Sequence, residues 1–518
     1  MFRLRRSPDF IAGQIHRRLH VAPRAGAHSG DAYCEGGSLP EAVADGVRTL
    51  VAAFLLLILP LSLAAQEGDP GDDQGAPEGE VEPAVTVLQG DQYSVSLGGY
   101  GSFRYELSDS EAVKNSLTFR RFIVTTEARI ANRLRIHSEV EYERLSEIEV
   151  ERGVERTEGG LEFEQELEGT NGSELAIEQA WAQFDFTRAL GLRFGAVLPP
   201  VGRFNVEHDD HQWNFPRRPL IDRDANVLPA PAAWTEMGLG LVGEAPIGGW
   251  EVSYQAYLLN GVALDFAIEE KVQTRAGQRN KLALEAAVSP TAGSFDGGNT
   301  ADAVAGRLVV SPTFNSEYAV SAYVGRYTPD FLDGGEPLST LGMDFRQPVG
   351  PAYLEGQLLW TRYHGLSGVL EEFARVAVDQ ATETEEDETA TLESEMEVAL
   401  SGLSDDRYGF WLDLGFPLQL DRFLGMDGAR VVPVLRYERV RFDDDLDEFA
   451  FADGAVTNLI QTDREQGRLS LGVSFRPHPQ AVFHFMYERN EAMTASLIDP
   501  EAPEDGTNGF VFGMAFGF

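Results

Sequence analysis

Hydrophobic and polar residues alternate along most of the chain after residue 92, in stretches of about ten residues. In 134–142, Leu, Ile, Val and Tyr occupy one set of alternate positions, while Arg, His and Glu occupy the other. The segment 468–476 shows the same pattern with Leu, Val and Phe against Arg and Ser. A period of two over this length is typical of a tilted strand that crosses an outer membrane. A soluble sandwich also alternates, but rarely places so many strands in one sheet.

The number of alternating segments predicts an all-β fold, a 16-stranded antiparallel transmembrane β-barrel with short periplasmic turns and long extracellular loops. The connections between the segments alternate in length as such a barrel requires. Expected strands are 93–105, 118–130, 133–144, 175–187, 190–198, 236–245, 249–260, 303–312, 318–327, 338–347, 351–364, 407–416, 429–442, 467–476, 480–489 and 509–518. Expected long loops are 145–174, 199–235, 261–302, 365–406, 443–466 and 490–508.

The last expected strand, 509–518, carries the sharpest local signal. Every second residue from Phe510 to Phe518 is aromatic or Met, while Val, Gly and Ala lie between them. A final strand that ends on an aromatic residue resembles the signature read by the barrel assembly machinery of Gram-negative bacteria. We therefore expect Phe518 to act as the assembly signal.

The first 90 residues precede the alternating part and predict export. An apolar stretch at 50–63 follows Arg48 and is followed by Ala64 and Ala65, which is the arrangement of a cleaved signal peptide. We interpret residues 1–65 as an upstream extension, added by a start codon placed too early, plus this signal. Residues 66–90 are acidic and rich in Pro and Gly, and predict a disordered periplasmic lead-in before the barrel of 91–518.

Charge and composition exclude several functions. The formal net charge of -41 opposes nucleic-acid binding, which needs a basic surface. Cys34 is the single cysteine, so no intramolecular disulfide or cysteine-based zinc site can form. No nucleophile elbow, HExxH or P-loop sequence occurs, and we expect no enzyme activity and no cofactor.

The two segments 178–186 and 192–203 resemble the central hairpin of the phosphate-selective porin O and P family. An acidic residue, Ala and an aromatic residue begin the first strand, and the second ends in Gly, Pro and Gly before a long loop. The matching residues are Glu178, Ala180, Trp181, Arg193, Gly195, Pro199 or Pro200, and Gly202. The resemblance implies a general porin-like barrel. Phosphate is not carried over as the solute, because the chain is very acidic and has almost no lysine outside 271–281.

The loop 199–235 follows the fifth predicted strand, which makes it the third external loop of the predicted barrel, and it is expected to fold inward and constrict the lumen. Opposed charges across such a constriction would create a transverse field; a surface loop with internally paired charges is the alternative. Candidate constriction residues are Arg203, Glu207, Asp209, Asp210, Arg217, Arg218 and Arg223. Candidate lumen-wall residues are Arg135, Glu139, Glu141, Glu178 and Arg193.

Two further clusters could bind cations. His208 and His211 flank two Asp residues, but an HxxH without a fixed third ligand is weak evidence, and we expect no metal there. The loops 365–406 and 443–466 are strongly acidic and could accept Ca²⁺ bridges to lipopolysaccharide; solvated, self-repelling loops are the plainer interpretation.

The sequence thus predicts an outer-membrane porin for passive diffusion of small hydrophilic solutes or ions. It is expected to form a homotrimer in outer-membrane lipid and lipopolysaccharide, without nucleic-acid partners. The alternatives are a substrate-specific anion (phosphate-type) or oligosaccharide channel, and a structural or adhesive surface barrel.

Overall fold

The computed structural model describes most of the chain after residue 84, and the predicted signal peptide and most of the lead-in lie outside the described residues. It describes 85–518 except 110–115, 144–146, 158–159, 171–173, 224, 273–279, 291–302, 314, 329–331, 333–334, 373–395, 402, 421, 424, 453–454 and 493–505.

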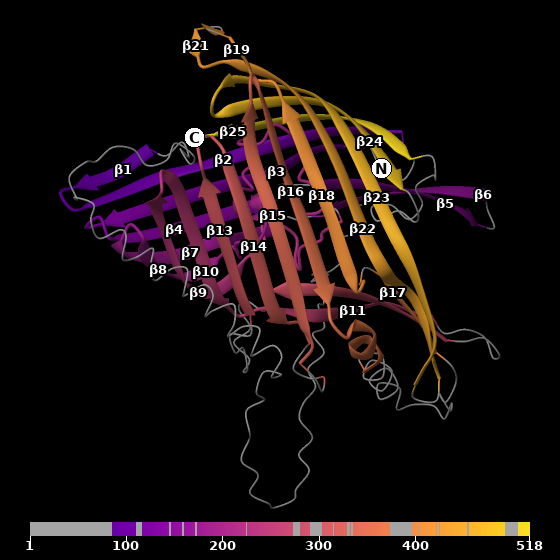
Figure 1. Cartoon of the computed structure of the whole chain (residues 1–518). Coiled ribbons are helices and arrows are strands. Elements are labelled where there is room, and N and C mark those ends of the chain that lie inside the picture. The colour runs from indigo at the N-terminus through magenta and orange to yellow at the C-terminus, as the bar shows by residue number, and fades with distance from the viewer. Residues whose placement is uncertain are drawn as a thin grey trace, which may run out of the picture.

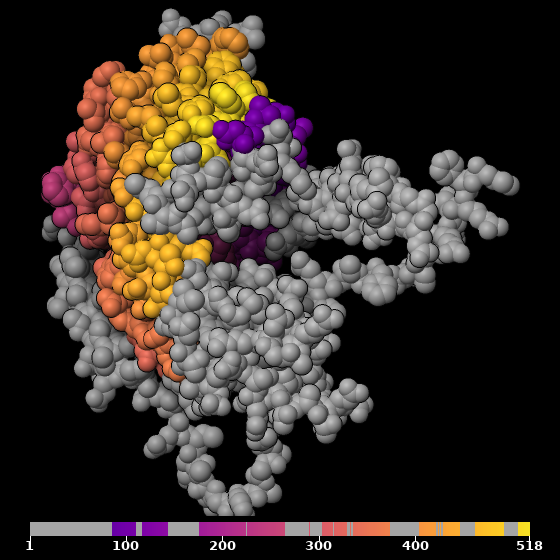
Figure 2. Space-filling model, turned by 90° about the vertical axis from the view of Figure 1, so that its right-hand side faces the viewer, coloured from indigo at the N-terminus to yellow at the C-terminus, as the bar shows by residue number. Residues whose placement is uncertain are grey.

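Sixteen antiparallel strands form a closed β-barrel, as the alternation predicts (Figure 1). Each strand pairs with its neighbours in the wall, and β2 pairs with β25 from Tyr100–Gly517 to Ser108–Gly509, which closes the ring. In Figure 2, the yellow C-terminal strands lie next to the indigo N-terminal part. In wall order the strands are β2 (Tyr93–Ser108), β3 (Ser116–Ile130), β4 (Leu134–Glu143), β7 (Glu174–Thr187), β8 (Leu190–Val197), β9 (Glu236–Ile247), β10 (Trp250–Leu259), β13 (Ala303–Ser311), β14 (Glu317–Arg326), β15 (Pro337–Val349), β16 (Ala352–Tyr363), β18 (Asp406–Gly415), β22 (Arg430–Ala452), β23 (Ala455–His478), β24 (Ala481–Ala492) and β25 (Thr507–Gly517).

The two faces of the wall differ as a membrane barrel requires. Along β23, Leu469 and Leu471 are 40% and 55% exposed, whereas Arg468 and Ser470 between them are buried. Since successive side chains of a strand point to opposite faces, the apolar row faces outward, toward lipid, and the polar row faces the interior. Phe518 closes the seam: its N–H donates to the carbonyl of Gly99 (2.9 Å) and its ring stacks on Phe122. Among the described residues, no helix has the length and apolar character needed to span a bilayer.

Several predicted loops contain further strands. The loops 145–174, 261–302 and 365–406 include β5 (Glu147–Thr157), β6 (Gly160–Thr170), β11 (Val262–Val272), β12 (Asn280–Pro290) and β17 (Met396–Ser401). β5 pairs with β6, β11 with β12, and β17 with both β12 and β22. The turn 417–428 holds β19 (Leu418–Gln419), β20 (Arg422–Phe423) and β21 (Met426–Asp427).

The prediction of a solvated acidic loop at 443–466 is wrong, because β22 continues to Ala452 and β23 begins at Ala455, and the two strands pair through this region. Shifts in register after Phe442 accommodate the run of acids, and Asp445 is buried against Arg464 (2.8 Å). At the other end of the chain, residues 85–90 form β1 (Val85–Gly90), paired with β2, instead of the last part of a disordered lead-in. The acidic stretch 373–395 lies outside the described residues.

Candidate functional site

The connection between β8 and β9, residues 199–235, lies inside the barrel and is called the inserted segment below. It contains one short helix, α2 (Arg203–Val206). Many of its apolar residues, including Leu220, Ile221 and Val227, are buried and pack in one cluster with wall residues such as Trp411. Its polar groups form hydrogen bonds to widely separated strands of the wall, among them β2, β14 and β23.

The first turn of the inserted segment is fixed by strands β14 and β16. Gly202 has φ +74°, a left-handed conformation that favours glycine, and its N–H donates to the hydroxyl of Ser321 (3.1 Å). The amide oxygen of Gln357 accepts from the N–H groups of Arg203 (2.6 Å) and Phe204 (3.0 Å). These are the first amides of α2, which have no partner within the helix, so the wall acts as its cap.

Strands β22 and β23 hold the middle of the inserted segment through Arg436, Arg468 and Arg476, which we call the arginine wall. All three are buried, and their guanidinium groups donate to backbone carbonyls of the segment. Arg436 also forms a bidentate pair with Asp413, and Arg468 pairs with Glu438. The carbonyls that accept are those of Arg217 (3.1 Å), Arg218 (2.8 Å), His211 (2.7 Å), Gln212 (2.9 Å) and Trp213 (2.6 Å).

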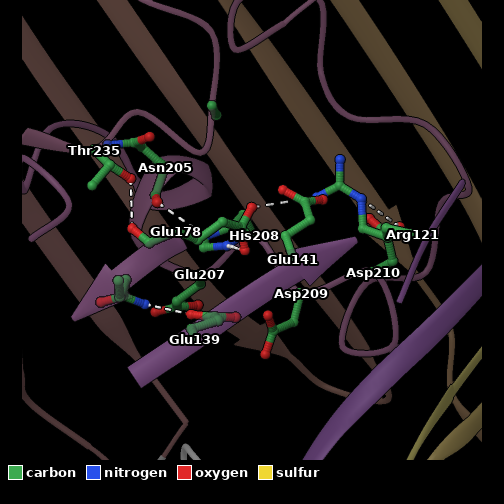
Figure 3. A network of polar contacts seen from close by, with 12 residues as sticks. Arg121, Glu139, Glu141, Glu178, Asn205, Glu207, His208, Asp209, Asp210 and Thr235 are labelled. Carbon is green, nitrogen blue, oxygen red and sulfur yellow. Dashed lines mark hydrogen bonds and ion pairs between the residues drawn. The ribbon is translucent and has the colours of Figure 1, made fainter. Parts of the chain in front are cut away.

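Strands β4 and β7 face the segment with Glu139, Glu141 and Glu178, which we call the acidic wall. All three are buried. A register shift in the β4–β7 pairing leaves Glu178 as an extra residue, and such a bulge can re-aim a side chain. Figure 3 shows the result: Glu178 meets His208 of the segment, with Nε2 and Oε2 3.3 Å apart.

Arg121 on β3 lies between the acidic wall and the segment. Its side chain is fully buried, and Nη1 is 3.1 Å from Glu141 and 3.8 Å from Glu178. Its Nε is 3.7 Å from Asp210 of the segment, which also accepts from Ser102 (2.6 Å). Arg121 is thus a functional candidate that the sequence analysis missed; its polar position on an alternating strand was the available signal.

The predicted constriction charges have partners both on the inserted segment and on the barrel wall. Arg203 pairs with Glu207 (2.7 Å) and Glu317 (3.2 Å). Arg217 bridges two wall acids, Glu106 (2.6 Å) on β2 and Glu488 (2.7 Å) on β24. Arg218 and Arg223 both donate to the carbonyl of Ala232, within the segment. The sequence could not rank these partners, because the paired residues lie up to 271 positions apart.

Two predicted lumen-wall arginines bond to the wall itself. Arg135 on β4 contacts Asp185 (3.1 Å). Arg193 on β8 donates to Gln183 (2.8 Å) and lies 3.9 Å above the ring of Trp181. Both arginines therefore contribute contacts within the wall near β7. Among the described residues, these contacts do not include the inserted segment.

The buried environment changes the acidity of groups on the segment. Burial opposes charging of His208, but the carboxylates of Glu178, Glu139 and Asp209 outweigh it and raise its pKa to about 10. Burial and the nearby Arg476 lower the pKa of His211 to about 4. Burial raises the pKa of Asp222 to about 8, although its contact with Gln357 acts in the opposite direction.

The two histidines of the HxxH sequence do not share one site. His211 packs its ring against Tyr100, with centroids 5.2 Å apart. His208 instead joins Glu139 and Asp209: one ligand atom from each lies within 4.8 Å of the others, and all three residues are buried. An imidazole with two carboxylates is a donor set that divalent transition metals accept.

A cavity of 410 Å³ lies between the end of the inserted segment and the acidic wall. Residues 230–235 form one side of it, and Glu141 and Glu178 the other. Arg223 also lines it, so the cavity carries charges of both signs.

Comparisons with known proteins give limited matches. No protein-family model matches the chain. An uncharacterized protein of Aquifex aeolicus (strain VF5) is 29% identical over 180 residues, which is 35% of this chain and 35% of that relative. The chain therefore matches about a third of the relative's length.

Solved structures with a similar fold are outer-membrane proteins. An anion-selective porin from Comamonas acidovorans is 11% identical, with 82% of this chain and 100% of that chain covered and a TM-score of 0.45. OmpT, an outer membrane protein of Vibrio cholerae, is 9% identical over 83% of this chain and 99% of its own, with a TM-score of 0.42. The outer membrane channel DcaP of Acinetobacter baumannii is 8% identical, with 84% and 100% covered and a TM-score of 0.40.

Proposed function

We propose that this protein is an outer-membrane channel for small hydrophilic solutes or ions, constricted by the inserted segment. The observation that carries the proposal is the place of that segment, which bonds to β2, β14, β16, β22, β23 and β24 and to the acidic wall from within the barrel. A sixteen-stranded barrel is wide enough for an aqueous channel, so an inserted element must set the size and charge of what passes.

The proposed constriction keeps the residues named from the sequence, namely Arg203, Glu207, Asp209, Asp210, Arg217, Arg218 and Arg223. The packed apolar cluster that the segment forms with wall residues favours small solutes over oligosaccharides. The partly exposed charges among these seven residues are Glu207, Asp210, Arg217 and Arg223, of which the first three have 29%, 21% and 22% of the side chain exposed. These four are the groups that a passing ion would meet.

The same proposal includes insertion into outer-membrane lipid after export, assembly as a homotrimer, and no enzyme activity. The outward apolar face supports membrane insertion. Membership of the porin O and P family remains a prediction from the resemblance, and a substrate-specific anion (phosphate-type) channel remains an alternative.

Arg217→Ala tests the proposed filter. The substitution leaves Glu106 and Glu488 without the cation that bridges them, so the channel should become more selective for cations. The reversal potential in a planar bilayer under a salt gradient measures this. The change should shrink in high salt, since the Debye length falls from about 10 Å at 0.1 M to about 3 Å at 1 M.

Arg188→Ala is the matched control. Arg188 also bridges two acids, Glu244 (3.0 Å) and Glu251 (2.8 Å), but it lies on the β7–β8 turn, away from the inserted segment. Its removal should leave the reversal potential unchanged. A folded Arg217→Ala barrel with wild-type selectivity at low salt would refute the proposed filter.

A further inference from the structure

We propose that Glu139, His208 and Asp209 form a binding site for one divalent transition metal ion, of which Zn²⁺ is the best match, and that the ion fastens the inserted segment to the barrel wall. Glu139 belongs to β4, whereas His208 and Asp209 belong to the segment, so the ion would join two parts of the chain. The inference does not depend on the channel function.

The geometry of the three residues meets the first requirement. Their candidate ligand atoms lie within 4.8 Å of one another in a region where all three side chains are at most 8% exposed. Zinc bonds of about 2.0–2.2 Å place neighbouring ligand atoms about 3.3 Å apart. Small side-chain rotations would bring the group to that spacing.

An unsatisfied ligand atom provides the second, independent observation. Glu139 is 2% exposed, and its Oε1 is buried without a hydrogen-bond partner among the described residues. Its other oxygen accepts from Gln179 (2.7 Å). A buried carboxylate oxygen without a partner is costly, and a metal ion would relieve that cost.

Each of the three side chains also has a contact that orients it. The Nδ1 of His208 lies 3.3 Å from the carbonyl of Asn205, and Oδ2 of Asp209 accepts from Gln212 (3.0 Å). Together with the Gln179 contact, these are the outer contacts that metal ligands usually have. They leave Oε1 of Glu139 for the ion, and Nε2 of His208 would exchange its contact with Glu178 for a bond to the ion.

Charge and access favour the same conclusion. Three carboxylates, those of Glu178, Glu139 and Asp209, act on the single imidazole of His208. A doubly charged ion among these carboxylates would offset their negative charge. Glu178, whose Oε2 is 3.3 Å from His208, also lines the 410 Å³ cavity, which gives the ion a way in and a possible fourth ligand.

Calorimetric titration of Zn²⁺ into the full-length folded barrel, stripped with EDTA and held in detergent, tests the site. We expect one tight equivalent per chain, and at least a tenfold weaker affinity in Glu139→Gln and in His208→Gln. His211→Gln is the matched control, because His211 is a buried histidine of the same segment outside the group; it should bind like the wild type. Heat-modifiable gel migration verifies that each variant is folded.

Absence of a tight equivalent in the wild type would overturn the proposal, as would wild-type affinity in both folded variants. If the variants fail to fold, Cu²⁺ bound to the wild-type barrel decides. Its electron paramagnetic resonance spectrum should show coupling to one imidazole nitrogen. A spectrum with oxygen ligands alone would place the ion on surface carboxylates and refute the site.

Discussion

The arginine wall and the acidic wall hold the inserted segment in different ways. Arg436, Arg468 and Arg476 donate to backbone carbonyls of the segment. The acidic wall instead meets side chains, above all His208. Contacts to the backbone do not depend on which side chains the segment carries, whereas contacts to His208 depend on that residue and on its protonation. The arginine wall therefore fixes the path of the segment's backbone. The contacts of the acidic wall can instead change with pH or with a bound cation.

Arg476→Ala should have the largest effect on this arrangement. It removes donors to three carbonyls, those of His211, Gln212 and Trp213, and unpaired buried groups cost about 1–3 kcal/mol each. We expect local opening of the segment to become easier by about 3 kcal/mol, or roughly a hundredfold faster amide exchange. Hydrogen–deuterium exchange of the peptides that span 205–222 measures it.

Arg346→Ala is the control for that variant. Arg346 lies on β15 and does not belong to the arginine wall. Its side chain donates a hydrogen bond to Glu355 on the neighbouring strand β16 (2.9 Å) and not to the segment. Exchange in 205–222 should stay at the wild-type rate. Equal exchange in both variants would show that the arginine wall does not position the segment.

The contact between the acidic wall and His208 of the segment should weaken as pH rises. The pKa of His208 is about 10 in the folded barrel against about 6.5 in an unfolded chain, so its stabilisation is complete below about pH 6.5, declines above it and is gone above about pH 10. In metal-free protein, the protection factors of the segment's amides, which correct for the base-catalysed rise of intrinsic exchange with pH, should fall across this range. His208→Gln should start from faster exchange and lose this pH dependence. A wild-type profile that matches the variant would contradict the account.

Asp222→Asn should have an effect of the opposite sign and stabilise the folded barrel. Asp222 is fully buried beside Gln357, and its pKa of about 8 means that the folded barrel retains a proton that the unfolded chain releases above about pH 3.9. Its burial therefore costs stability increasingly from about pH 4 to pH 8. The variant should unfold at a higher temperature than the wild type at pH 8, and at a similar temperature at pH 4. Heat-modifiable migration measures both.

The wall was predictable from the sequence, and the contacts of the segment were not. Strict alternation reveals strands such as β23, because one face must be apolar toward lipid. The alternation also shows which residues point inward, including Glu139. It does not show that Arg217 reaches Glu106 and Glu488, since β2 and β24 come close only because β25 pairs with both of them.

Two features were missed for local reasons. The acids that follow Phe442 favour a loop by composition, but shifts of register allow β22 to continue and bury Asp445. The bulge at Glu178 interrupts the alternation of β7 by one residue, and a sequence pattern does not reveal where such an insertion re-aims a side chain.

The conductance of a barrel without the inserted segment tests the central claim most directly. Residues 203–232 are replaced by a short Gly-Ser linker, and single-channel conductance is compared with the wild type in a planar bilayer, after gel migration has shown that the variant is folded. If the segment constricts the lumen, the conductance should rise several-fold and ion selectivity should weaken. A folded variant that conducts like the wild type would contradict the account.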